Sequence, residues 1–331
     1  MPPVSNPQMQ PIHWLVVLVA GTLFGSSFLF VNIAVTELPP LSLAAGRALL
    51  AVPIAYVVMR AAGFRLPPPG RAWVPLILLG FLTAAIPYSA IAWGQRHIPS
   101  GLGGILFGAI PIFSLILTPL FLRDERVTAA RVAGAVIGFG GVVLVIGPEA
   151  LAGIDQQILG AGVTLAAAFS YAAGAIYART CPDLHPVVMT AGQLVVGSVV
   201  MLIAALVVDA PWTLRPSAGA LGALAGTAVV GTALPTILLF WLVRQAGPGN
   251  ASLVTFVMPV VAVALGAAAL GERLPLIAFA GLGLILIGAA AIGGRLKPRA
   301  KALAGPVHND RRLGRARDSV LPISPANASG Q

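Results

Sequence analysis

Charged residues are scarce in this sequence, in which Asp, Glu, Lys and Arg together make up 9% of 331 residues. In a soluble globular chain these residues account for roughly a quarter. Hydrophobic residues make up 58% of the sequence, and the mean hydropathy is +0.94. So few charges cannot cover a folded surface in water. The scarcity excludes an ordinary soluble protein and indicates a chain that folds in lipid.

Residues that commonly carry catalysis or bind metals are also few. The single cysteine, Cys181, excludes an intramolecular disulfide and a cysteine-rich metal site. The four histidines lie in the tails or in predicted loops, and the sequence contains neither an HExxH motif nor a glycine-rich phosphate loop. No Asp or Glu falls well inside a predicted span. We therefore expect no enzymatic activity, no catalytic residue, no metal and no cofactor.

Long apolar runs recur from Trp14 to Gly294. Each is long enough to cross a hydrocarbon core of about 30 Å as a helix. Backbone groups in lipid must pair internally, and a helix does this within one segment. The sequence therefore predicts an all-α polytopic membrane protein with ten transmembrane helices, at residues 14–35, 41–59, 73–95, 100–122, 131–147, 157–178, 187–208, 218–243, 249–270 and 276–294.

The arginines of the predicted loops are distributed unequally between the two sides of the membrane. If both termini are cytoplasmic, the cytoplasmic loops hold eight arginines and the opposite loops hold three. The positive-inside rule then places the short tail 1–13 and the basic tail 295–331 in the cytoplasm, as parts of a multi-pass protein of the cell (inner) membrane.

Much of the net charge of +10 lies in the tail 295–331. We expect this tail to be disordered and to contact anionic lipid headgroups. Membrane lipids are therefore predicted partners, and nucleic acid is not.

The second half of the chain resembles a copy of the first. At a constant offset of 148 residues, five residues coincide with identical ones, in the pairs Pro87/Pro235, Trp93/Trp241, Arg96/Arg244, Gly101/Gly249 and Pro111/Pro259. We assign a first repeat to residues 14–147 and a second to residues 148–294. Each repeat holds five predicted helices, an odd number, so the second must enter the membrane in the opposite orientation. Inverted repeats of this kind are the basis of alternating access, with a binding site near the midplane between them.

These features resemble the drug/metabolite transporter superfamily, specifically its ten-helix EamA type with two EamA repeats. The resemblance covers nearly all of residues 14–294. It implies a bacterial inner-membrane exporter of amino acids or related small metabolites, with helices arranged around a central cavity. The residues that carry it are the prolines of helices 4 and 9, the acidic residues before helices 5 and 10, and a proline followed by an arginine in helix 2, namely Pro111, Pro259, Glu125, Glu272, Pro40 and Arg47.

Arg47 is the first candidate for substrate binding. It lies about seven residues into the second predicted helix, where a guanidinium in hydrocarbon costs roughly 2.5–3.5 kcal/mol. It should therefore face a cavity, where it can bind a carboxylate through a bidentate pair. The alternative is that Arg47 snorkels to the interface or bonds to carbonyls at a helix end. The second repeat has Gln193 at the corresponding position, so the two halves differ at the predicted cavity.

Further polar and aromatic residues along the predicted helices complete the expected substrate site. In lipid, hydroxyls and amides also bond between packed helices, and tryptophans near helix ends form the aromatic belt. Packing and membrane anchoring are therefore the alternative roles of each. The residues are Ser26, Ser27, Asn32, Tyr88, Trp93, Tyr171, Gln193, Thr236 and Trp241.

Four prolines lie inside predicted helices at matching places of the two repeats, namely Pro87, Pro111, Pro235 and Pro259. Each frees a backbone carbonyl, which is tolerated at membrane depth only where protein or a cavity surrounds it. These prolines are candidate hinges, with static bends as the alternative. We interpret Glu125 and Glu272, which open the loops before helices 5 and 10, as caps and interfacial anchors.

The sequence predicts a secondary transporter that exports small amino-acid-like or other amphipathic metabolites by alternating access. Two alternatives remain: an uptake carrier or facilitator of the same fold, and a membrane scaffold or lipid-handling protein that transports nothing. Glycine pairs four residues apart, such as Gly134 and Gly138, favour close helix packing within the chain, with a homodimer as the other use.

Overall fold

The computed structural model describes residues 9–121, 128–146, 155–181, 183–246, 248–251 and 253–292. These residues form helices and connecting loops, and no strand occurs among them. Eight helical stretches are long and apolar enough to span a membrane, and two shorter apolar helices occupy the remaining predicted spans. The predicted all-α membrane fold is confirmed. Glu125 and the tail 295–331 lie outside the described residues.

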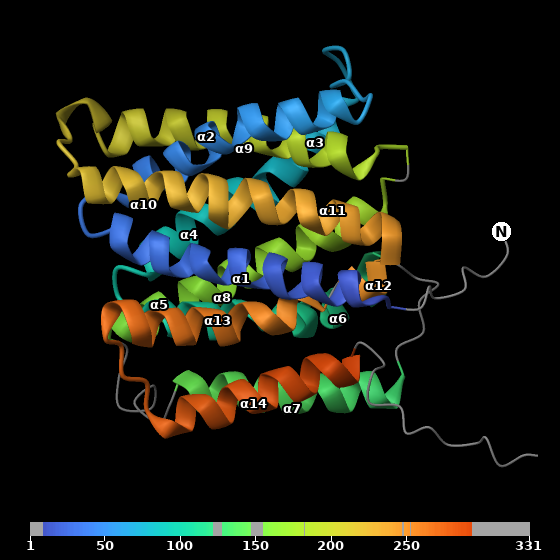
Figure 1. Cartoon of the computed structure of the whole chain (residues 1–331), viewed down its shortest axis with the longest axis vertical. Coiled ribbons are helices and arrows are strands. Elements are labelled where there is room, and N and C mark those ends of the chain that lie inside the picture. The colour runs from blue at the N-terminus through green and yellow to red at the C-terminus, as the bar shows by residue number, and fades with distance from the viewer. Residues whose placement is uncertain are drawn as a thin grey trace, which may run out of the picture. The chain divides into compact units, whose positions relative to one another are not determined.

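The helices follow one another along the chain as Figure 1 labels them. They are α1 (Pro11–Ala34), α2 (Pro40–Ala61), α3 (Trp73–Gly80), the π-helix η1 (Phe81–Ala85), α4 (Ile86–Gly94), α5 (Ser100–Phe107), α6 (Ile110–Phe121), α7 (Ala129–Ile146), α8 (Gln156–Arg179), α9 (Pro186–Val208), the 3-10 helix η3 (Pro211–Thr213), α10 (Ala218–Ala228), the π-helix η4 (Val229–Ala233), α11 (Leu234–Ala246), α12 (Pro248–Ala251), α13 (Val254–Leu270) and α14 (Leu276–Ile292).

Large apolar side chains lie on the outside of the bundle rather than only in its core. Val57 is 64% exposed, Val136 68% and Val207 79%. A soluble protein rarely leaves such side chains in contiguous patches. On a bundle of long apolar helices they are the surface that contacts acyl chains.

Two predicted spans contain a π-helical turn directly before a proline. η1 precedes Pro87 by two residues, and η4 precedes Pro235 by two residues. Proline has no N–H and its ring clashes with the carbonyl four residues earlier, so the helix widens there by one residue. The two turns lie 148 residues apart, which is the offset of the sequence repeat.

The other two interior prolines have unequal surroundings. Pro111 is the second residue of α6, just after the helix breaks at Gly108 and Ala109. Pro259 lies inside the continuous helix α13. The repeat symmetry of the backbone is therefore kept at Pro87 and Pro235 and lost at Pro111 and Pro259.

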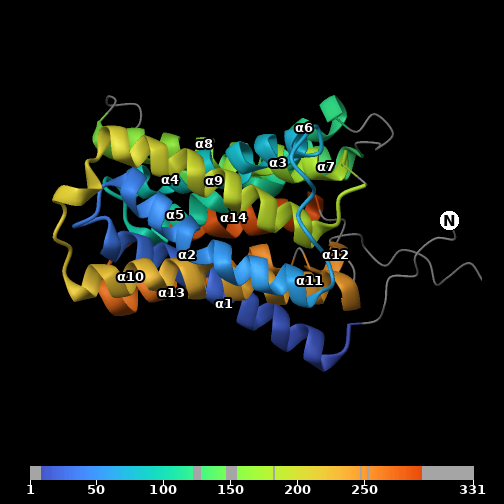
Figure 2. The same cartoon turned by 90° about the horizontal axis from the view of Figure 1, so that it is seen from above.

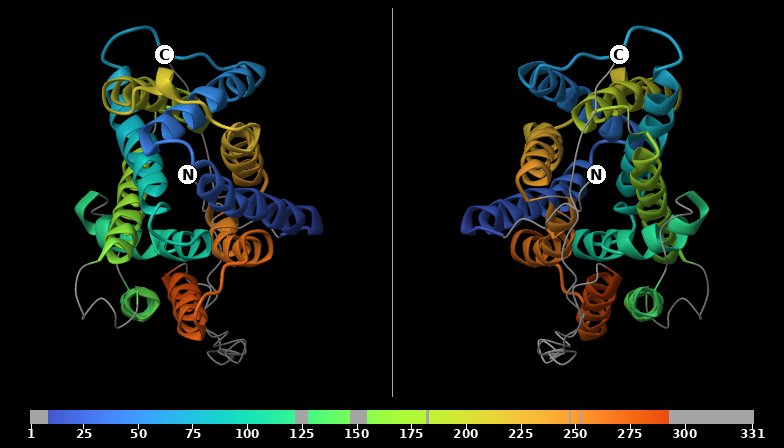
Figure 3. Two further views of the ribbon diagram at one scale, coloured as in Figure 1. Left: turned by 90° about the vertical axis from the view of Figure 1, so that its left-hand side faces the viewer. Right: turned by 90° about the vertical axis from the view of Figure 1, so that its right-hand side faces the viewer.

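The helices of the two halves interleave instead of forming two separate bodies. The most closely packed pairs join one helix from each half: α7 with α14, α2 with α9, α1 with α13, and α4 with α8. Figures 1 and 2 show α2 and α9 side by side, and Figure 3 shows α7 and α14 as a pair at one edge. Any cavity on the axis of the bundle is therefore lined by both halves.

We call the face at which α1 begins the proximal face, and the face at which α1 ends the distal face. At the distal face, the backbone N–H of Ser42 at the start of α2 donates to Asp209, which directly follows α9, at 2.7 Å. The start of α2 and the end of α9 thus lie at the same face. Because α2 and α9 are corresponding helices of the two repeats, the repeats are inverted.

Glycines bring the last helices of the two repeats into backbone contact. A Cβ on Gly141 of α7 would lie 2.7 Å from the Gly281 carbonyl and 2.9 Å from the Ile285 nitrogen of α14. A Cβ on Gly134 would lie 2.7 Å from the Gly288 carbonyl. The glycine pattern of α7 therefore serves packing inside the chain, which is one of its two predicted uses.

This contact gives the first prediction. Gly141→Val forces α7 away from α14, because the atoms it meets are backbone, and overpacking of this kind costs about 1–3 kcal/mol. The neighbouring Gly140→Val is the control, since a Cβ there meets nothing within 4 Å. Thermal unfolding of the purified variants in detergent should show a lowered midpoint for Gly141→Val alone. Equal midpoints for the two variants would contradict the close contact.

Candidate functional site

A cavity of about 410 Å³ lies between the two halves. Its walls come from α1, α2, α4, α5, α6, α8, α9, η4, α11, α12 and α13. Ligand cavities usually measure about 300–1,000 Å³, so the volume suits one small molecule. The cavity lies where inverted repeats place their binding site.

The cavity extends toward the proximal face and is closed at the distal face. Thr190, near the start of α9, and Ala251, at the end of α12, line its proximal part. At the other end, Val31, Leu38 and Leu43 form part of a buried apolar cluster beneath the distal loops. The cavity lining therefore reaches the proximal ends of α9 and α12, whereas apolar packing covers it at the distal face.

Three carboxylates join the two halves at the distal face, and we call these contacts the distal clamp. Glu37 accepts from the backbone N–H and the hydroxyl of Ser217, each at 2.7 Å, at the start of α10. Asp209 accepts from the N–H and hydroxyl of Ser42 at 2.7 and 2.9 Å. Each carboxylate caps a helix of the opposite half, where the positive end of the helix dipole favours a negative charge.

Glu272 makes the third contact of the distal clamp. Its two oxygens accept from the backbone N–H groups of Ser100 and Gly101 at 2.6 and 2.9 Å. The predicted role of Glu272 as a cap is confirmed. The helix it caps is α5 of the other half and not the helix that follows it.

Arg47 is buried, with 8% of its surface exposed, and lines the cavity. Its Nε donates to the Thr232 hydroxyl at 2.8 Å, and its Nη2 lies 3.5 Å from the Gly231 carbonyl. Thr232 in turn donates to the Thr227 carbonyl at 2.8 Å, which fixes its lone pairs toward Arg47. The guanidinium thus has neutral oxygen partners from the other half.

The carbonyl that Arg47 meets lacks its ordinary helical donor because of a proline. Gly231 lies four residues before Pro235, so its carbonyl lacks the N–H that would bond to it in a regular helix. The π-helix η4 turns this group toward α2. A sequence feature that breaks helix hydrogen bonding therefore supplies a partner for a buried cation.

The ring of Tyr88 also contacts the guanidinium. The Cζ of Arg47 is 4.1 Å from the centroid of the Tyr88 ring, within the range of a cation–π contact. Tyr88 follows Pro87 on α4, and it also lines the cavity. Arg47 is thus held between η4 and α4, while it still lines the cavity.

The pseudo-symmetric position in the second half is Gln193 on α9. Its Oε1 lies 2.8 Å from the Thr83 hydroxyl of η1. Thr83 precedes Pro87 by four residues, as Gly231 precedes Pro235. Each half therefore presents one polar side chain to the π-turn of the other, but only the Arg47 side carries a charge.

Aromatic and apolar side chains form most of the remaining wall. Phe28 and Phe107 lie with ring centroids 5.8 Å apart, and Phe107 and Tyr171 with centroids 5.6 Å apart. Phe24, Ile110 and Met258 also line the cavity. Such edge-to-face and tilted ring packing suits an apolar or aromatic ligand.

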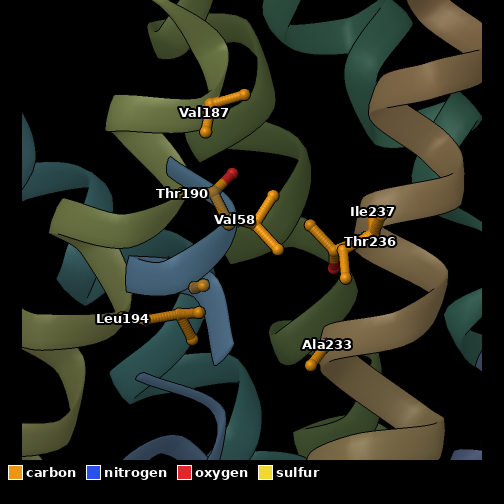
Figure 4. Close-up of a pocket in the computed structure, with 8 residues that line it drawn as sticks. Val58, Val187, Thr190, Leu194, Ala233, Thr236 and Ile237 are labelled. Carbon is orange, nitrogen blue, oxygen red and sulfur yellow. The ribbon is translucent and has the colours of Figure 1, made fainter. Parts of the chain in front are cut away.

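A second, much smaller pocket of about 20 Å³ adjoins this cavity between α2, α9 and α11. Figure 4 shows Val58 of α2 facing Thr190 and Leu194 of α9 on one side and Thr236 of α11 on the other. Thr190, Leu194 and Thr236 line both spaces. The smaller pocket is therefore a side extension of the cavity and holds about one water.

Six of the ten predicted substrate-site residues line the cavity. These are Ser27, Arg47, Tyr88, Tyr171, Gln193 and Thr236. They come from spans that are far apart in the sequence.

The other four lie outside the cavity lining. Ser26 donates to the Leu23 carbonyl of its own helix at 2.8 Å, and Asn32 donates to the Gln95 carbonyl at 3.3 Å. Trp93 is 37% exposed and Trp241 36% exposed, near opposite faces of the bundle. Packing and membrane anchoring, the alternative roles of these residues, fit all four.

Several lining residues were absent from the predicted site. Thr232 is one of them. A threonine hydroxyl on a helix usually bonds to its own backbone, and the sequence pattern does not distinguish Thr232 from such a residue. Gly231 could have been found, because it lies four residues before Pro235. Phe28, Phe107 and Met258 look like ordinary lipid or core residues in the sequence.

The arrangement of two inverted halves around a cavity agrees with a match to a known family. The sequence matches the EamA-like transporter family over residues 12–147 and again over residues 158–294. The chain belongs to the EamA-like transporter family. It is therefore a membrane transporter of the drug/metabolite type.

Relatives from bacteria and archaea match over most of their length. The uncharacterised inner membrane transporter YedA of Escherichia coli K12 is 29% identical over 295 residues, covering 87% of this chain and 93% of YedA. An uncharacterised transporter of Archaeoglobus fulgidus is 27% identical, with 83% and 96% covered. A probable amino-acid metabolite efflux pump of E. coli K12 is 28% identical, with 82% and 91% covered.

A protein known from a crystal structure shares the fold. It superposes with a TM-score of 0.61 at 20% identity, covering 86% of this chain and 98% of that chain. The fold of this EamA-like chain has therefore already been seen in a crystal.

The arrangement around Gly231 gives the second prediction. Pro235→Ala restores an N–H that can donate to the Gly231 carbonyl, so the carbonyl turns away from Arg47. We expect substrate affinity to fall severalfold, measured by binding to the purified protein. Pro53→Ala is the control, because Pro53 lies inside α2, the helix of Arg47, but is absent from the cavity lining. An unchanged affinity in Pro235→Ala would show that the freed carbonyl does not position Arg47.

Proposed function

We propose that this EamA-like transporter is a secondary carrier that exports small amino-acid-like or other amphipathic metabolites by alternating access. It works in the cell (inner) membrane with both termini in the cytoplasm. The observation that carries the proposal is Arg47, a buried guanidinium in a closed-ended cavity between two inverted halves. A charge in that place is costly unless it serves a ligand or a pathway.

The conformation supports an alternating mechanism. The cavity reaches the proximal ends of α9 and α12, while buried apolar residues and the distal clamp close the other end. If the proximal face is cytoplasmic, as the arginine distribution predicts, this is the inward-facing state of an exporter. Release on the far side then requires the three clamp contacts to separate.

The direction of transport rests on a relative. The E. coli relative at 28% identity is named a probable amino-acid metabolite efflux pump, and export is carried over from that name. The same cavity would serve an uptake carrier or facilitator, so direction must be measured. The sequence contains no nucleotide-binding loop, so an ion or substrate gradient drives the flux.

Counterflow into proteoliposomes tests the proposal directly. Liposomes preloaded with a panel of unlabelled amino acids and related acids should accumulate the labelled compound that the carrier accepts. Protein-free liposomes are the control. Absence of counterflow for every compound, with correctly inserted protein, would favour the scaffold or lipid-handling alternative.

The third prediction concerns Arg47 itself. Arg47→Ala should abolish counterflow without loss of membrane insertion, because a charge-assisted hydrogen bond worth about 1.5–3 kcal/mol disappears. Arg47→Lys keeps the charge and should retain part of the flux, although it loses the planar geometry of the guanidinium. Counterflow in Arg47→Ala at the wild-type rate would remove Arg47 from the site.

The fourth prediction concerns the distal clamp. The triple variant Glu37→Gln, Asp209→Asn, Glu272→Gln loses three charge-assisted caps, so the distal end should open more often. The readout is labelling of Val31→Cys, a buried distal position, by an impermeant thiol reagent in a Cys181→Ala background. We expect severalfold faster labelling from the distal side.

Asp155→Asn is the matched control for the clamp variant. Asp155 also caps a helix at the distal face, but it accepts from Ile158 within its own helix at 2.8 Å. Its loss should leave Val31→Cys protected. Equal labelling in the control and the triple variant would mean that the clamp does not hold the two halves together.

The pH dependence of the clamp follows from Glu37. Hydrogen bonds from the backbone and then the side chain of Ser217 hold the pKa of Glu37 below its ordinary value. The free energy that the Glu37 carboxylate contributes to distal closure is therefore fully present above the ordinary Glu pKa of about 4.3. It is lost only as the pH falls through the lower pKa that Glu37 has in the closed state. The labelling rate of Val31→Cys, divided by the rate of a free thiol at the same pH to remove the change in thiolate fraction, should be equal at about pH 5.5 and about pH 8.

A further inference from the structure

The cavity contains one charged side chain and no counter-charge. Arg47 is the only charged residue among the described residues that line it. It contacts the Thr232 hydroxyl, the Gly231 carbonyl and the Tyr88 ring, all of which are neutral. A buried cation without an anion is destabilised. The missing negative charge is what a ligand would supply.

The carboxylates of the distal face are already engaged elsewhere. Glu37, Asp209 and Glu272 each accept from a helix N-terminus. Asp155 caps its own helix. Within the described part of the chain, no carboxylate lines the cavity to receive a ligand ammonium group.

Aromatic faces do not replace a carboxylate here. A ring can hold an ammonium group by a cation–π contact, but the Arg47 guanidinium already lies over the Tyr88 ring at 4.1 Å. A second positive charge nearby would be repelled by the first. The positive end of a zwitterion therefore has no favourable position near the anion site.

The walls fix the remaining chemistry of the ligand. Around Arg47, the cavity is lined by the packed rings of Phe28, Phe107 and Tyr171 and by Met258. Aromatic rings and the flexible thioether of methionine favour an apolar or aromatic body. The cavity is therefore charged at one place and apolar along most of its wall.

We propose that this carrier selects monoanions with an apolar or aromatic body, such as 2-oxo acids or N-acylated amino acids, and discriminates against zwitterionic amino acids. The carboxylate pairs with Arg47, and the body lies along the Phe28, Phe107 and Tyr171 rings. The inference rests on the proposed carrier function and narrows its substrate class to amino-acid derivatives without a free ammonium group.

Three matched acids that differ at the amino position, and one amine without a carboxylate, test the inference. Phenylpyruvate, N-acetylphenylalanine and phenylalanine share a benzyl group and a carboxylate, and phenylethylamine has the ring and the ammonium group alone. Binding to detergent-purified protein is measured by calorimetry, and counterflow in proteoliposomes is measured with labelled phenylpyruvate. The two anions should bind at least tenfold more tightly than phenylalanine, and phenylethylamine should not bind.

Variants tie the preference to the charge in the cavity. Arg47→Gln should lose the tenfold preference for N-acetylphenylalanine over phenylalanine, while Arg47→Lys should keep a weaker form of it. Arg96→Gln is the control for removal of one positive charge, because Arg96 is exposed in the distal loop after α4. It should bind both ligands as the wild-type protein does.

The outcomes separate the inference from the carrier function. Phenylalanine that binds as tightly as N-acetylphenylalanine, or no binding by either anion, would overturn the inference. Selective binding of the anions without any counterflow would support the inferred site and overturn the carrier function. A tenfold preference that survives in Arg47→Gln would also overturn the inference, because the preference would then have another source.

Discussion

A guanidinium inside an apolar helix bundle needs oxygen partners, and the arrangement of the two halves supplies them to Arg47. The residue comes from α2 of the first half, whereas Gly231 and Thr232 come from η4 of the second. In either half alone, burial of Arg47 would carry the free-energy cost of a guanidinium without hydrogen-bond partners in the membrane. The contact therefore makes the position of α2 depend on η4, and the cavity lies beside this contact.

Proline provides the geometry that this contact requires. A regular helix uses every carbonyl internally, so its backbone can offer little to a neighbour. Pro235 and Pro87 remove one helical hydrogen bond each, and a π-turn forms directly before each of them. At each of these π-turns a backbone oxygen has a partner from another helix, since the Gly231 carbonyl meets Arg47 and the Leu82 carbonyl accepts from the Ser170 hydroxyl. Pro87 and Pro235 were predicted as hinges, and their roles in motion remain predictions.

Much of the fold follows from the sequence, because apolar length and repeat symmetry are strong constraints. The ten spans, their inversion and the importance of Arg47, Tyr88 and Gln193 rest on residues that stand out against an apolar background. The aromatic wall could not be predicted, because phenylalanine is also common on lipid-facing helix surfaces. Nothing in the sequence therefore distinguishes Phe28 and Phe107 from such residues. Trp93 and Trp241 were predicted from repeat symmetry, yet symmetry preserves membrane-anchoring positions as readily as cavity positions. The carboxylate contacts between Glu37 and Ser217, 180 residues apart, depend on tertiary packing alone.

The asymmetry between Arg47 and Gln193 bears on how the two states of the carrier differ. In an inverted-repeat carrier, the opposite state arises when the two halves exchange conformations. In the state described here, Arg47 of α2 and Gln193 of α9 each contact the π-turn of the opposite half. An exchange would change both contacts, but only one of them carries a charge, so the exchange costs more free energy at Arg47 than at Gln193. A bound anion would reduce this free-energy difference between the two states. It would neutralise Arg47 in the state in which the guanidinium has fewer oxygen partners. Substrate charge and conformational change are in this way linked through a single side chain.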